Sequence, residues 1–139
     1  MKNRKLDYYL VFIEAWILLH VSKAIILFFP FKKIAAKLGV SQVETPKDPI
    51  AGYQLSLVEI SLKRAVKYTV HNSKCYDQAL AAKFMLNRQQ LPSTLYFGLS
   101  KEDNQLSAHA WVRCGDTIVI GKRGFEKYTP VAWFGTVKA

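Results

Sequence analysis

The sequence predicts an α+β fold in which helices are followed by a small antiparallel sheet. Helical patterns occupy most of the chain up to residue 90. From residue 94 onward, short apolar segments with strand-type alternation are separated by turn-forming residues, as in hairpin strands. With 139 residues, half of them hydrophobic, the chain can bury one core, so we expect one compact domain with an appendage.

The first helical segment is unusually apolar and looks like a targeting sequence, because basic residues precede the stretch 6–31. Glu14, His20 and Lys23 interrupt this stretch, and no small-residue cleavage site follows it. No run within this stretch without an acidic or basic side chain, with His20 counted as neutral, is longer than Ala15–Ser22, which 24–31 equals. Such a run is well short of the roughly 18–20 apolar residues of a membrane span. No spanning helix is therefore expected.

We expect two short helices here instead, over about 5–22 and 24–38. Pro30 would kink or restart the second helix, and Gly39 is a typical residue for its C-terminal end. Both helices are expected to pack on the rest of the protein. Docking to a membrane surface or to a protein partner is the alternative, because the segment is aromatic and basic.

A linker is expected after these helices. Residues 40–52 (VSQVETPKDPIAG) contain two prolines, several polar residues and a glycine. We place a boundary near residue 48. This gives an N-terminal helical extension and linker at 1–48, and a second domain at 49–139.

The second domain should begin with two helices. Residues 53–70 have the spacing of an amphipathic helix, and residues 75–90 are rich in alanine, leucine and other strong helix formers. Ser73 can serve as the N-cap of the second helix, which places Cys75 in its first turn.

The remaining residues predict the sheet. A strand is expected over about Thr94–Leu99, followed by a charged loop at 100–105. The segments 107–114 (SAHAWVRC) and 117–121 (TIVIG) should then form a β-hairpin.

The turn of that hairpin falls at Cys114, Gly115 and Asp116. The last segment, 124–134, is expected to be a loop with one edge strand, whose pairing Pro130 limits.

Charge and composition narrow the function classes. Twenty basic and ten acidic residues give a formal net charge of +10, which suits an acidic peptide, an anionic membrane or nucleic acid. No RNA-binding signature or zinc-finger spacing is present, so nucleic acid is not expected as a partner. Two cysteines make no disulfide framework and indicate a reducing cytosol. The sequence contains no metal spacing and no phosphate-binding loop, so no metal or cofactor is expected.

One pair of residues could carry chemistry. A thiol at the start of a helix, as predicted for Cys75, meets the positive end of the helix dipole, which favours the thiolate. An imidazole on a facing strand, as predicted for His109, could form an ion pair with it, and the Cys75 N–H could help to hold an oxyanion. Spacing alone nevertheless favours structural roles for both residues. Cys114 lies away from any helix start, so we expect it to be structural.

The order of these motifs resembles a known family. Cys75 is followed by the pattern xxxALAAxxxLxR, then by LYFGLS, SAHAWVRC and an apolar strand that ends in glycine. This order is similar to the transglutaminase-like cysteine peptidases of lasso peptide biosynthesis. It most resembles the stand-alone leader peptidase, which is like the C-terminal part of the microcin J25-processing protein. The resemblance implies a papain/transglutaminase-like fold with Cys75 as nucleophile and His109 as base.

One position departs from that family. Its members often place an aspartate about a dozen residues after the histidine, on the neighbouring strand. Here Gly121 lies opposite His109 if the hairpin loop has three residues, and Lys122 does if it has two. Asp116 lies in the turn, and Glu126 could reach back only if the following loop folds over. The third member is therefore open: none, or an orienting carbonyl or amide.

The resemblance also implies a substrate and partners. The substrate would be a ribosomally made precursor peptide in the cytoplasm, delivered by a separate PqqD-like leader-recognition protein. An ATP-dependent lasso cyclase would use the freed amine. Residues 1–48 are too short and too helical to supply a leader-recognition module. The alternative is a non-catalytic peptide-binding or membrane-associated module. The third possibility is an enzyme that transfers the acyl group to an amine in place of water.

Overall fold

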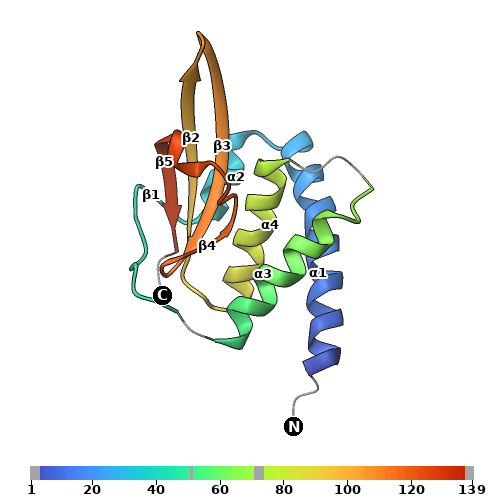
Figure 1. Ribbon diagram of the computed structural model, residues 1–139. Coiled ribbons are helices and arrows are strands. Elements are labelled where there is room, and N and C mark those ends of the chain that lie inside the picture. The colour runs from blue at the N-terminus through green and yellow to red at the C-terminus, as the bar shows by residue number, and fades with distance from the viewer. Residues whose placement is uncertain (1–3, 51, 71–73, 137–139) are drawn as a thin grey trace.

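The computed structural model describes residues 4–50, 52–70 and 74–136. Within these ranges the chain forms four α-helices and one five-stranded sheet, so the predicted α+β class is confirmed (Figure 1). The helices are α1 (Arg4–Phe28), α2 (Phe31–Leu38), α3 (Tyr53–Val66) and α4 (Cys75–Arg88).

The sheet is antiparallel throughout, with the strand order β1-β5-β2-β3-β4. Its centre is the long hairpin of β2 and β3, and β5 returns along the other side of β2. A 3₁₀ turn, η1, lies between β4 and β5. The strands are β1 (Val40–Ser41), β2 (Thr94–Glu102), β3 (Gln105–Cys114), β4 (Thr117–Ile120) and β5 (Thr129–Gly135), and η1 is Phe125–Lys127.

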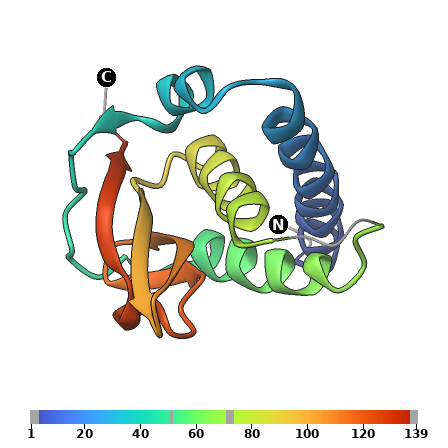
Figure 2. The ribbon, with the colours of Figure 1, turned by 90° about the horizontal axis from the view of Figure 1, so that it is seen from above.

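Helix α4 lies at the centre of the molecule, with the sheet on one side and α1 on the other, while α3 runs beside it from the sheet to α1 (Figure 2). Ala79, Ala81 and Ala82 are fully buried along it, and such small side chains let neighbouring elements approach closely. Helix α1 packs on both α3 and α4 and shares one hydrophobic core with the sheet. The N-terminal helices thus pack on the rest of the protein as expected, while the boundary near residue 48 stays a prediction.

The N-terminal helices differ from the expected pair of short ones. Helix α1 continues through Ser22 and Lys23 to Phe28, and the chain breaks at Pro30. Neither Ser22 nor Lys23 is a helix breaker, whereas proline lacks an N–H and disfavours helical geometry in the residue before it. By length and composition alone, α1 over Lys5–Phe28 is apolar enough to cross a membrane, which the interruptions in its sequence had argued against.

The charged loop expected at 100–105 is also wrong. Strands β2 and β3 run through it and pair as far as Glu102 and Gln105, leaving a two-residue turn. Asp103 and Asn104 have φ values of 51° and 63°, the left-handed geometry that matches the twist of hairpin strands. Asp and Asn tolerate this geometry better than most residues, so a polar charged segment forms a tight hairpin here.

The two long helices of the second half are shorter than expected. Helix α3 ends at Val66 and not at 70, because the Thr69 hydroxyl donates a hydrogen bond to the Val66 carbonyl over 3.1 Å and competes with the helix. Helix α4 begins at Cys75 as predicted, with Lys74 at its N-cap. The predicted cap, Ser73, lies outside the described residues.

Lys83 is fully buried in α4, and its ammonium donates to the Ser93 carbonyl and to the hydroxyls of Ser93 and Thr136 at 2.6–2.9 Å. All three acceptors are neutral, so burial dominates and lowers the pKa of Lys83 to about 8 from its ordinary 10.5. Between these two values the unfolded chain binds more protons than the folded one. The contribution of Lys83 to the free energy of unfolding therefore rises with pH from about 8.

We predict that Lys83→Met removes this rise, which amounts to about 3 kcal/mol in full. Urea unfolding at neutral and alkaline pH measures the free energy of unfolding of the chain with Lys83 and of the Lys83→Met variant. Burial raises the pKa of Cys114 and works in the opposite direction above its ordinary value, so both chains should also carry Cys114→Ala. Equal pH slopes for the two chains would contradict the assignment to Lys83.

Candidate active site

Cys75 is the first residue of α4, as the sequence predicts, and is half-buried. The buried carboxylate of Asp77 accepts the Lys74 N–H over 3.1 Å and fixes the start of the helix. The first N–H groups of any α-helix lack partners within the helix and form the positive end of its dipole. The Cys75 thiol thus lies beside N–H groups that can hold an anion formed next to it.

His109 lies on β3, opposite Gly98 of β2. Its Nε2 lies 2.8 Å from the carbonyl oxygen of Gly121. Because a carbonyl oxygen can only accept, Nε2 carries the proton in this contact, and Nδ1 of the neutral ring is left with a free lone pair. The geometry thereby selects one tautomer and leaves Nδ1 as the basic nitrogen.

The imidazole is also held by aromatic rings. Its centroid lies 5.7 Å from that of Trp111 and 5.0 Å from that of Tyr128. A Cβ on Gly98 would come within 2.9 Å of the Trp111 ring and of the Tyr128 Cβ, so glycine is needed for these rings to approach. The sequence had not singled out Tyr128 or Gly98. The only available signal was the density of aromatic residues in 125–134.

Cys75 and His109 border the same cavity, of about 390 Å³. β4 pairs with β3 only at Val112–Cys114, so β3 has a free edge where it carries His109. No hydrogen bond joins the Cys75 thiol to the His109 ring among the described residues, and such contacts often close only when substrate binds. The other side chains at the cavity are mostly apolar: Phe31, Tyr76, Phe97, Leu99, Val131 and Ala132.

Two aromatic members of this lining come from α2 and α4. Phe31 belongs to α2, in the N-terminal extension, and packs against Phe97 with ring centroids 5.4 Å apart. Tyr76 follows Cys75, and its buried hydroxyl has no hydrogen-bond partner among the described residues. Burial raises the pKa of Tyr76, so this phenol stays protonated. The extension is therefore part of the site, although sequence reasoning placed it outside.

No residue pairs with His109 in the β3–β4 ladder, but Gly121, one of the two residues that the sequence left open, contacts its ring through the backbone. The hairpin loop has two residues, but a register shift beyond Arg113 pairs Val112 with Ile120, and the ladder ends there. Lys122 is consequently unpaired, and it is the Gly121 backbone that reaches the imidazole. Gly121 has φ +83°, and a Cβ there would lie 2.5 Å from the Ala110 carbonyl oxygen.

Within the described part of the chain, no carboxylate hydrogen-bonds His109. Asp116 lies in the exposed turn, at least five residues along the strand, or roughly 16 Å at about 3.3 Å per residue. The loop that carries Glu126 does fold back, but Glu126 is exposed and Tyr128 is the residue that meets the ring. In the described structure, the group that contacts Nε2 of His109 is thus a backbone carbonyl.

The other cysteine and histidines lie elsewhere. Cys114 is fully buried in the core, where burial raises the pKa of its thiol, in keeping with the structural role expected for it. His20 lies on α1 and contacts the Trp16 carbonyl over 2.8 Å, and His71 lies outside the described residues. The described ranges contain no group of three His, Cys, Asp or Glu side chains that could hold a metal ion.

The comparisons with known proteins agree with this geometry. A family model described as Transglutaminase-like superfamily matches residues 19–132. The match runs from the second half of α1 to β5 and includes both Cys75 and His109. No curated protein and no solved structure matches the chain significantly.

Proposed function

Because the chain belongs to the transglutaminase-like superfamily, whose chemistry is of the cysteine peptidase and acyltransferase type, we propose that it is the stand-alone leader peptidase of a lasso peptide pathway. In this role it removes the leader from a ribosomally made precursor peptide. One observation carries the proposal: a helix-start thiol and a histidine held in a single tautomer border the same cavity.

The first half of the reaction forms a thioester. The Cys75 thiol gives its proton to Nδ1 of His109, and the resulting thiolate attacks the carbonyl carbon of the leader's last residue. The charge that develops on oxygen lies near the N-terminus of α4. The C–N bond then breaks as Nδ1 of His109 gives its proton to the departing nitrogen. The released amine is the new N-terminus of the core peptide.

The second half releases the leader. Nδ1 of His109, now neutral, takes a proton from water, and the resulting hydroxide attacks the thioester carbon. The C–S bond breaks, which frees the leader with a C-terminal carboxylate and restores the Cys75 thiolate. The Gly121 carbonyl keeps Nε2 protonated through both halves, so the same nitrogen acts as acid and as base.

The surface of the cavity supports a peptide substrate with apolar or small uncharged residues at the scissile bond. Phe31, Leu99 and Val131 offer apolar contacts and no charge to pair with an acidic or basic side chain. The net charge of +10 favours an acidic precursor over a basic one.

The resemblance to the stand-alone leader peptidase also supplies the proposed partners. In residues 4–48 the described structure has the helices α1 and α2 and the two-residue strand β1, which do not form a leader-recognition module of strands and helices. A separate PqqD-like protein would therefore deliver the precursor in the cytoplasm. An ATP-dependent lasso cyclase would then join the freed amine to a side-chain carboxylate of the core peptide.

Incubation with a lasso precursor, with and without its leader-recognition protein, tests this function by mass spectrometry. We expect two fragments whose masses add up to the precursor plus one water, formed faster when the partner is present. Cys75→Ala should still bind the precursor and yield no fragments.

Each other outcome excludes the peptidase. A product that retains the acyl group on an added amine would indicate amide transfer. Binding without cleavage by the unmodified protein, under conditions in which Cys75 reacts with an alkylating agent, would indicate a non-catalytic binding module.

A further inference from the structure

The outward face of α1 is apolar along its whole length. Its exposed residues recur at helical spacing, so they form one continuous stripe. Only 22% of the most apolar window of this helix is buried, although the helix packs on α3 and α4. Phe28, at the end of the stripe, is 80% exposed. The stripe consists of Leu6, Leu10, Ile13, Ile17, Val21 and Phe28.

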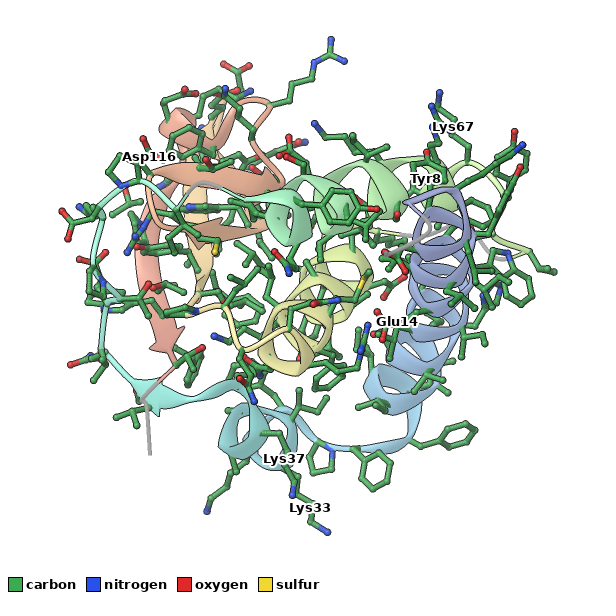
Figure 3. All side chains as sticks on the ribbon, turned by 90° about the horizontal axis from the view of Figure 1, so that it is seen from below. Tyr8, Glu14, Lys33, Lys37, Lys67 and Asp116 are labelled. Atoms are coloured by element: carbon green, nitrogen blue, oxygen red, sulfur yellow. The ribbon has the colours of Figure 1, made fainter. Side chains whose placement is uncertain are left out.

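The acidic residues of α1 lie beside this stripe and not on it. Figure 3 shows Glu14 on the side of α1 that faces α4, and its carboxylate forms a two-bonded ion pair with Arg88 of that helix. Asp7 is half-buried. The exposed stripe therefore carries no negative charge.

Lysines lie at the borders of the stripe. Lys5 is exposed at its start, and Lys32 and Lys33 are exposed just after its end. Lys67 is exposed beside Tyr68, whose ring packs against Phe12 of α1 at 6.1 Å between centroids. Figure 3 shows Lys33 pointing away from the body of the molecule. An apolar stripe bordered by cations matches the acyl and headgroup layers of an anionic bilayer.

Other occupants of this face fit less well. Two copies of the chain would each bring a net charge of +10, so their long-range electrostatic interaction is repulsive. An acidic protein partner would satisfy the lysines but would have to cover an apolar stripe of about six helical turns that has no polar group at its centre.

Crossing the bilayer would separate α1 from its own protein. Val11, Ala15 and Leu19 form the inward face of the helix and belong to the common core. A spanning α1 would expose those residues' partners on α3 and α4 to water and break the Glu14–Arg88 ion pair. The packed arrangement instead leaves the outward stripe free while the inward face stays buried.

We infer that the exposed stripe of α1 lies in the surface of an anionic membrane, parallel to its plane, and that the lysines around it contact lipid headgroups. This attachment does not depend on the proposed peptidase reaction. It would hold the cavity of Cys75 and His109 near the membrane surface, because α1 shares one hydrophobic core with the elements that carry these residues.

Sedimentation with vesicles tests this inference on the full chain. We expect binding to phosphatidylcholine vesicles that contain phosphatidylglycerol, and binding at least tenfold weaker to phosphatidylcholine alone. Ile17→Glu with Val21→Glu should weaken binding to the anionic vesicles at least about tenfold, because both side chains are exposed in the protein and would be buried in lipid. Leu106→Glu, at a still more exposed position near the tip of the β2–β3 hairpin, should leave binding unchanged.

The lysines are tested separately. Lys32→Glu with Lys33→Glu should weaken binding to anionic vesicles, by roughly fivefold for each charge removed, and should reduce its dependence on salt. Deletion of α1 is unsuitable, because it would remove part of the core. Circular dichroism and thermal unfolding of each variant confirm that it is folded.

Three outcomes would overturn the inference. The unmodified protein could fail to bind anionic vesicles, or bind phosphatidylcholine equally well. It could form a dimer, or a complex with the leader-recognition protein, that Ile17→Glu with Val21→Glu dissociates while vesicle binding is absent. Finally, the full chain could be released from cell membranes by detergent and not by high salt, which would identify α1 as a membrane span.

Discussion

His109→Ala is expected to lower kcat/KM for precursor cleavage by about 10²- to 10⁴-fold, the range in which a positioned acid and base contributes. The same change should alter the alkylation rate of Cys75 far less. No hydrogen bond joins the Cys75 thiol to the imidazole in the described structure, where Nε2 of the ring contacts the Gly121 carbonyl instead. His109 would thus act on the bound substrate more than on the resting thiol.

Iodoacetamide labelling read by mass spectrometry separates the two effects. Cys114 is fully buried and burial raises the pKa of its thiol, so labelling near neutral pH reports Cys75. Cys75→Ala provides the background for that measurement, and circular dichroism verifies the fold. Two results would contradict the assignment: His109→Ala that retains full cleavage, or alkylation that falls in parallel with cleavage.

The sequence predicted the parts of the site that depend on local structure. Cys75 begins α4 because strong helix formers follow it, and His109 lies on a strand because apolar residues alternate around it. The order of these two elements also indicated the transglutaminase-like superfamily, which the family match confirms.

The parts that depend on tertiary structure were not predictable in the same way. The register shift in β4 moves Gly121, and not a side chain, against the imidazole. No residue pattern within TIVIG distinguishes a shifted ladder from a regular one. Likewise, Phe31 reaches the cavity because α1 runs on to Phe28 and the chain turns at Pro30, and that path was hidden by the polar residues in α1.

Gly121→Ala should lower kcat for cleavage by about 10²-fold with little change in KM. An added Cβ would lie 2.5 Å from the Ala110 carbonyl oxygen and 2.8 Å from the Trp111 Cβ, so the backbone must move. That movement takes the Gly121 carbonyl away from Nε2 of His109, and a shift of about 1 Å in a catalytic group can cost about 10²-fold. Binding of the precursor does not depend on this contact, so KM should change little.

The same loop provides a matched control for backbone strain. Gly124 also has a left-handed φ, +76°, but a Cβ there would meet only the end of the Lys127 side chain at 3.5 Å. Gly124→Ala thus bears the conformational cost of about 1–2 kcal/mol without displacing anything near the imidazole. It should lower the thermal stability and leave kcat nearly unchanged.

Two carboxylates complete the comparison. If the Gly121 carbonyl is what orients His109, Asp116→Asn and Glu126→Gln should each retain most of the activity, since neither carboxylate contacts the ring. Equal losses of kcat in Gly121→Ala and Gly124→Ala would mean that strain in the loop, and not the carbonyl, controls the rate. A near-complete loss in either carboxylate variant would mean that an acid reaches the imidazole once substrate is bound. If a backbone carbonyl orients the Cys–His dyad, neither of these two results is expected. No side-chain carboxylate then holds the imidazole, and only a movement of the Gly121 backbone disturbs it.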